Sequence, residues 1–174
     1  CCCWWADARA VTSCQDATLC HRRSGGGKLK ARFPSVTRLH YPTSGTHFHC
    51  YVALKQSRPG EARQVMLGLL GWDPYLKTVI AVDDDIDVTQ DSQVLWALAT
   101  HFQPHRDLFR IDGLPGSPLD PSSSADGTTS RLALDATRSP DFHGIRAVIG
   151  DDALGRARNL VGSLAGVKLR GAVT

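Results

Sequence analysis

The chain has 174 residues, of which 42% are hydrophobic and 21% charged, with a formal net charge of +3, which is ordinary for one compact globular domain. No run of Lys and Arg is longer than Arg22-Arg23, so the charge pattern argues against a nucleic-acid or anionic-membrane surface. No apolar stretch approaches the roughly 20 residues that cross a bilayer, and no signal-peptide pattern opens the chain, so we expect a cytoplasmic location.

Residues 1–30 read differently from the rest of the chain. Five of the six cysteines lie in the first twenty residues without a C-x-x-C pair, which is neither a zinc spacing nor a disulfide framework. We expect this segment to be disordered or artefactual. The sixth cysteine, Cys50, lies in an apolar run and is predicted to be a buried, reduced thiol.

From Phe33 onward the pattern becomes regular. Residues 36–40 predict a short strand, residues 42–45 a turn, and residues 46–54 a second strand. Pro59-Gly60-Glu61 is typical of a helix start, with a proline and an acid in the first turn. Apolar positions at helical spacing follow, at Ala62, Val65, Met66, Leu69 and Leu70.

The middle of the chain predicts a buried strand and a second helix. Residues 76–82 are apolar except for Lys77 and Thr78, which indicates a strand buried on both faces. Asp91 can cap the helix that follows, and Pro104 closes it. The buried face of this helix is predicted to comprise Val94, Leu95, Leu98, Ala99 and Phe102.

The last third predicts two strands and a final helix. Residues 108–111 and 131–136 are strand-like, residues 113–118 are a loop whose Gly and Pro exclude regular structure, and residues 121–129 are a mobile surface loop. Residues 151–164 form an amphipathic helix. Alternating strands and helices predict an α/β fold, a mixed sheet with helices packed on it.

Four carboxylates follow the central strand, at Asp83, Asp84, Asp85 and Asp87. Open α/β sheets place their ligand crevices at the carboxyl ends of strands. An EF-hand is excluded, because counting from Asp83 puts Val88 where that loop needs glycine. Spacing leaves three readings open: a D-x-D site for a divalent cation in a glycosyltransferase, a receiver-type phosphoacceptor pocket, and structural acids that cap the next helix and bind Arg or Lys.

Two other features are candidates for chemistry. His47 and His49 alternate within the predicted strand and would project from one face about 7 Å apart, either as a metal pair or as ordinary, partly buried histidines. Lys77 interrupts an apolar strand, where a lysine requires a partner. The sequence predicts that Lys77 either reaches the acid run or faces a cleft that receives an anion.

Several segments match one family in order along the chain. They are Phe33-Pro-Ser-Val-Thr, Ser44-Gly-Thr-His-Phe-His, Pro59-Gly-Glu-Ala-Arg, Asp73-Pro-Tyr-Leu-Lys-Thr-Val-Ile-Ala-Val-Asp-Asp-Asp-Ile-Asp-Val, Val94-Leu-Trp-Ala-Leu-Ala-Thr, Arg106-Asp, Gly113-Leu-Pro-Gly-Ser-Pro-Leu-Asp-Pro and Thr129-Ser-Arg-Leu-Ala-Leu-Asp-Ala-Thr. Together they resemble the C-terminal domain of UbiD family decarboxylases, the 3-octaprenyl-4-hydroxybenzoate carboxy-lyase type. The resemblance predicts one α/β domain over residues 31–165 and a tail at 166–174.

The resemblance implies a carboxy-lyase that releases CO2 from aromatic, heteroaromatic or α,β-unsaturated acids. The family works on prenylated FMN, an electron sink, held with manganese and potassium, and a Glu-Arg-Glu set supplies the proton that replaces CO2. These groups belong to the family's upstream portion, and Glu61 is the only Glu of this chain. We therefore carry over no catalytic or metal residue, and expect the chain alone to bind no cofactor and to be inactive.

The resemblance does carry over one wall of the substrate cleft, at Tyr75, Lys77, Leu114 and Gly116. Lys77 would meet a substrate carboxylate or phenol. The acids Asp83, Asp84, Asp85 and Asp87 become cleft-edge and structural acids, and the helix over residues 151–164 would clasp a neighbouring subunit.

The expected partner is the enzyme's own N-terminal portion, with a homo-oligomer when the enzyme is complete. Two alternatives remain open: a non-catalytic small subunit that completes a separate flavin-binding chain, and a fragment of a D-x-D metal-dependent glycosyltransferase. Ubiquinone biosynthesis is one role of the family, and no residue of this sequence selects it.

Overall fold

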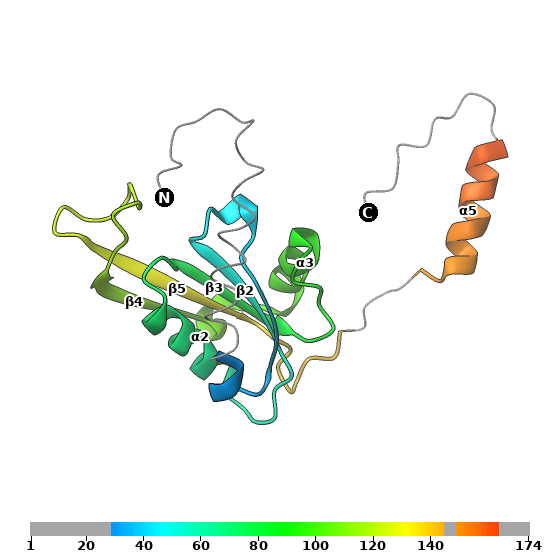
Figure 1. Ribbon diagram of the computed structural model, residues 1–174. Helices are drawn as coiled ribbons and strands as arrows, with labels where there is room; N and C mark the ends of the chain where they lie inside the picture. Colours follow the sequence, from blue (N-terminus) through cyan, green and yellow to red (C-terminus); the bar gives the residue numbers. More distant parts are fainter. Residues whose placement is uncertain (1–28, 145–148, 164–174) are drawn as a thin grey trace. The chain divides into compact units, whose positions relative to one another are not determined.

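A computed structural model describes residues 29–144 and 149–163. The chain divides into two compact units, residues 1–142 and 143–174. The first unit holds the sheet and its helices (Figure 1), and the second holds helix α5, Asp151–Ser163. In the first unit the strands are β1 (Val36–His40), β2 (His49–Leu54), β3 (Thr78–Asp83), β4 (Leu108–Pro115) and β5 (Thr128–Ala136), and the helices are η2 (Thr43–Gly45), α2 (Glu61–Trp72), α3 (Asp91–His101) and α4 (Pro104–Asp107).

The five strands form one mixed sheet in the order β1-β2-β3-β5-β4. The three central strands, β2, β3 and β5, run parallel, and β1 and β4 are antiparallel edges. The four inner residues of β3 are buried, as expected for a strand covered on both faces. The predicted fold class, a mixed sheet with helices packed on it, is confirmed.

A hydrophobic core lies on each face of this sheet. On one face α2 packs Val65, Met66 and Leu70 against Cys50, Val52, Leu54 and Val79. On the other face α3 packs Val94 and Ala97 against Ala53, Ile80 and Val82. Helices α2 and α3 therefore cover opposite faces (Figure 1), and the buried thiol predicted at Cys50 is confirmed.

Two strands differ in length from the prediction. Residues 113–115, expected in a loop, belong to β4, because Leu114 and Pro115 pair with Thr129 and Thr128 of β5. The pairing register shifts between Ile111 and Leu114, where Gly113 has a φ of 71°, and the strand continues beyond this irregularity. On the partner strand, β5 begins at Thr128 rather than at residue 131.

The second strand and the α3 helix also need correction. Strand β2 begins at His49, and His47 precedes it with a φ of 68°, so the two histidines do not alternate within one strand. Helix α3 buries Val94, Ala97 and His101 and leaves Leu95 exposed, so the predicted core face is wrong by about one residue. Pro104 does follow α3, and it also begins the short helix α4.

Among the described residues, no helix is both long and apolar enough to cross a membrane.

Candidate functional site

The predicted site residues fall at the two ends of strand β3. Tyr75 and Lys77 precede β3, and Leu114 and Gly116 lie where β4 ends beside the start of β5. The acid run begins at Asp83, the last residue of β3. Since a strand rises about 3.3 Å per residue, Lys77 and Asp83 are separated by roughly 20 Å. The four cleft residues therefore share one end of the sheet, and the acids lie at the other.

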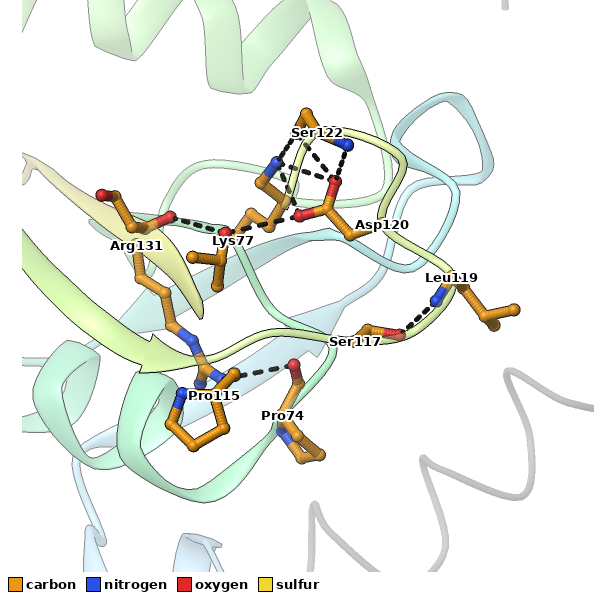
Figure 2. A network of polar contacts seen from close by, with 10 residues as sticks. Pro74, Lys77, Pro115, Ser117, Leu119, Asp120, Ser122 and Arg131 are labelled. Carbon is orange, nitrogen blue, oxygen red and sulfur yellow. Dashed lines mark hydrogen bonds and ion pairs between the residues drawn. The ribbon is translucent and has the colours of Figure 1, made fainter. Parts of the chain in front are cut away.

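Lys77 has its partners at its own end of the sheet. Its Nζ lies 2.9 Å from Oδ2 of Asp120 and donates to the hydroxyl of Ser122 at 2.6 Å (Figure 2). The prediction that Lys77 reaches the acid run is therefore wrong, because that run lies at the far end of β3. The prediction that Lys77 faces a cleft that receives an anion stays a prediction.

The carboxylate of Asp120 is the centre of this cluster. Its side chain is only 4% exposed, and it accepts hydrogen bonds from Lys77 Nζ and from both the amide and the hydroxyl of Ser122. Burial opposes ionisation, but these donors and the charge of Lys77 outweigh it and hold the pKa of Asp120 well below its usual value. Lys77 and Asp120 thus form a charged pair that joins the start of β3 to the loop after β4.

The backbone around this pair determines the positions of the other three predicted cleft residues. The amide of Gly116 donates to the carbonyl of Gly127 at 2.9 Å, which closes the base of the loop over residues 117–126. A Cβ atom at Gly116 would lie 2.8 Å from Oγ of Ser123 and 3.1 Å from the carbonyl oxygen of Gly127, so a side chain at this position would have to displace its neighbours. Leu114 is half-buried in β4, and Tyr75 is exposed.

Arg131 is a second cation at this end of the sheet, and sequence reasoning missed it. The residue is 3% exposed, and its guanidinium donates to four backbone carbonyls rather than to a carboxylate. These belong to Leu70, Asp73 (2.8 Å), Pro74 (3.2 Å) and Pro115 (2.9 Å), partly shown in Figure 2. Arg131 therefore links three segments through hydrogen bonds: the C-terminal end of α2, the segment before β3 and the end of β4.

Two arginines contact the acid run at the other end of the sheet. Arg138 donates to Asp83 at 2.9 Å and to Asp85, and the first of these bonds is the main reason its pKa is raised. Arg38 donates to the carbonyl of Asp84 at 2.7 Å. The carboxylate of Asp87 accepts from the amide and hydroxyl of Thr89, which lowers its pKa.

These contacts agree with the structural reading of the acids. Both carboxylates of the D-x-D pair, Asp83 and Asp85, are engaged by one arginine, and within residues 29–144 and 149–163 no group of three His, Cys, Asp or Glu side chains is placed to hold a metal. His47 and His49 are both exposed and lie in no such group. The assignment of the four acids to a cleft edge stays a prediction.

Some of these partners leave a signal in the sequence, and some do not. A lysine inside an apolar strand shows that an acid must lie nearby, but nothing local selects Asp120, 43 residues away. Arg131 reads as an ordinary strand residue, because its acceptors are backbone carbonyls 16 to 61 residues distant. The acid run likewise indicates that cations must lie nearby, but it does not identify Arg38 or Arg138.

Comparison with known proteins identifies the family. A family profile described as the 3-octaprenyl-4-hydroxybenzoate carboxy-lyase C-terminal domain matches residues 19–136. The chain therefore belongs to the UbiD C-terminal domain family, as its motifs predict. The match begins at residue 19, before the predicted domain start at 31, and the predicted domain limits stay a prediction.

Curated relatives and solved structures agree with this membership. Anhydromevalonate phosphate decarboxylase of Archaeoglobus fulgidus is 40% identical over 108 residues, which are 62% of this chain and 25% of that protein. The apo structure of Klebsiella pneumoniae 3,4-dihydroxybenzoic acid decarboxylase has a TM-score of 0.70 at 27% identity, covering 78% of this chain and 31% of that one.

A second solved structure is the UbiD-class enzyme HmfF of Pelotomaculum thermopropionicum in complex with FMN. It has a TM-score of 0.65 at 28% identity, covering 74% of this chain and 29% of that one. The chain thus spans about a quarter of the length of the curated relatives that it matches.

Proposed function

We propose that this chain is the C-terminal part of a prenylated-FMN-dependent decarboxylase that acts on aromatic or α,β-unsaturated carboxylic acids. It contributes one wall of the substrate cleft and contacts within the assembly, and it is inactive alone. The single observation that carries the proposal is the family match over residues 19–136, together with relatives that are decarboxylases.

The cleft wall consists of Tyr75, Lys77, Leu114 and Gly116 in this proposal. Its support is that these four residues, far apart in the sequence, lie at one end of the sheet. Lys77 is the residue that selects an anionic substrate group. Its side chain is 29% exposed, so one side of the ammonium can face a ligand while Asp120 and Ser122 hold the other. A substrate carboxylate or phenol oxygen would be a further acceptor for this ammonium.

In this proposal the chain contributes no ligands for the metals of the family. Asp83 and Asp85 are bound to Arg138, and the described part of the chain has no other group that could hold a metal. We assign the binding of manganese, potassium and the flavin to the rest of the enzyme. The chemical step takes place there as well. The partner that we propose is therefore the flavin-binding portion, as the same polypeptide or as a separate subunit in the cytoplasm, with a homo-oligomer when complete.

The test is reconstitution. The full chain is co-expressed with the Archaeoglobus fulgidus relative from which the matching 108 residues have been deleted, and prenylated FMN is supplied. Release of CO2 is measured for 3,4-dihydroxybenzoate and anhydromevalonate phosphate, the acids named for two of the relatives. We expect CO2 release from at least one acid, only when both proteins are present, and a loss of at least tenfold in Lys77→Met. Flavin-loaded assemblies that release no CO2 from any acid would contradict the proposal.

A genuine small subunit and a gene fragment differ in the DNA upstream. If translation in all three frames gives the flavin-binding segment and the Glu-Arg-Glu set before residue 31, the partner belongs to the same gene. If a stop codon and a separate start intervene, the partner is another subunit.

A further inference from the structure

Helix α3 has a second apolar face that the core covers only in part. Leu95, Leu98, Ala99 and Phe102 recur at the spacing i, i+3, i+4 and i+7, which places them on one side of the helix. We call these four residues the outer stripe of α3. Leu95 is 55% exposed and Ala99 is exposed, whereas Leu98 and Phe102 are partly buried and pack against the core. The fully buried residues of α3 are Val94, Ala97 and His101, and Trp96 also packs against the core.

The outer side of α2 is different. Its exposed Leu67, at 44%, has Arg63, Gln64 and Gly71 one turn away, together with Leu70, which is buried in the core. A single exposed leucine among polar residues is ordinary on a protein surface. In α3, by contrast, no charged residue occurs from Ser92 to Phe102. A helix with apolar residues on two sides is more typical of the interior of a larger protein than of its surface.

We infer that the outer stripe of α3 is a docking surface for the flavin-binding portion of the enzyme. This inference rests on the proposed function, which names that partner, and adds the surface through which the partner is held. The chain spans about a quarter of the length of its curated relatives, so the remaining three quarters is the polypeptide that such a face would meet.

The size of the stripe favours this partner over a second copy of the chain. Two partly exposed leucines, an alanine and the edge of one phenylalanine expose on the order of 200 Å², set against the 150–250 Å² that a single aromatic side chain buries. A stable dimer needs about 800 Å² on each partner. A small patch is sufficient where the two parts are joined in one polypeptide or one assembly, because their effective concentration is high.

The test compares Leu95→Lys with Leu67→Lys in the full chain. Lysine and leucine have similar helix propensities, both positions are about half exposed, and both changes add one charge to a helix. Each variant carries an affinity tag and is co-expressed with the Archaeoglobus fulgidus relative that lacks its matching 108 residues. Because the shortened relative can fail to fold, each change is also made in a chimera in which residues 29–142 replace the matching segment.

We expect Leu95→Lys to reduce recovery of the shortened relative by at least tenfold and to lower the melting temperature of the chimera by several degrees. Leu67→Lys should change neither. Sedimentation and thermal unfolding of the isolated chain should be the same for both variants and the unchanged chain.

Three results would overturn the inference. Equal behaviour of the two variants in the chimera would show that the stripe is not covered by the flavin-binding portion. A dimer of the isolated chain that Leu95→Lys alone dissociates would make the occupant a second copy. A melting temperature of the isolated chain lowered by Leu95→Lys alone would place the occupant within this chain. Failure of the proposed function is separate, since it would appear as absent CO2 release while recovery still depends on Leu95.

Discussion

Replacement of Arg131 by methionine should cost more stability than any other single charge removal in the described part of the chain. Methionine has a similar length and packs in apolar surroundings, but it leaves the carbonyls of Leu70, Asp73, Pro74 and Pro115 without their donor. Burial is the main cause that lowers the pKa of Arg131, yet arginine remains protonated at every ordinary pH. The variant therefore loses a charged donor throughout the accessible pH range.

The magnitude follows from the burial and the number of acceptors. Hydrogen bonds from a charged donor contribute about 1.5–3 kcal/mol each, but removing a buried charge also removes its desolvation cost, so the four do not add. A buried acceptor left without a donor costs about 1–3 kcal/mol, and because the four do not add we expect a total loss of about 3–5 kcal/mol. For a chain of this size we expect a fall in melting temperature of about 10 °C. Arg131→Lys should lose roughly half as much, because one ammonium cannot reach four carbonyls.

The assay is urea unfolding at pH 7, followed by circular dichroism, with Arg110→Met as the matched control. Arg110 lies on the neighbouring strand β4, its side chain is 65% exposed, and its carboxylate partner Asp112 is exposed as well. Such a pair contributes less than about 1 kcal/mol. If Arg131→Met and Arg110→Met unfold within about 1 kcal/mol of each other, the reasoning about Arg131 is refuted.

Three further predictions concern the two ends of β3 and the loop. Because the folded-state pKa of Asp120 is depressed, its contribution to stability is present above about pH 4 and is lost as pH falls further. Asp120→Asn should therefore lower the free energy of unfolding by about 1–3 kcal/mol at pH 7 and flatten the loss of stability between pH 5 and 2. Urea midpoints that fall in parallel with pH in the two proteins would contradict this. Replacing both Asp83 and Asp85 by Asn should leave manganese affinity unchanged in calorimetry, because Arg138 already holds both carboxylates; a large loss of affinity would support the D-x-D site. Gly116→Ala should destabilise the protein by about 1–2 kcal/mol through contact with Ser123. The control Gly71→Ala lies on α2 with open space around it and should be neutral or slightly stabilising. Equal melting temperatures of the two variants would show that the base of the loop is not tightly packed.

Much of the fold can be read from the sequence because its signals are local. The apolar run before Asp83 predicts a buried strand, and residues 62–70 predict the face that α2 presents to the core. The sequence predicts the strand after residue 108 too short, because Gly113 and Pro115 are poor strand residues by themselves. Pairing with Thr128 and Thr129 of β5 keeps them in the sheet.

The candidate site is less accessible to sequence reasoning. The family motifs point to Tyr75, Lys77, Leu114 and Gly116, which the fold brings to one end of the sheet. The motifs cannot separate this group from the acid run, because Lys77 and Asp83 lie in one continuous motif although the strand that joins them is roughly 20 Å long. The sequence also contains both apolar stripes of α3, and periodicity alone cannot tell which of two such stripes faces the sheet.

The sequence by itself determined the alternation of strands and helices, the family, and the need for partners at Lys77 and at the acid run. Only the tertiary structure decided those partners: Asp120 for Lys77, Arg138 for Asp83 and Asp85, and backbone carbonyls for Arg131. The physical reason is one of range. Propensity and hydrophobic period act over a few neighbouring residues, whereas these contacts join residues 16 to 61 positions apart and exist only once the sheet has set the order of its strands.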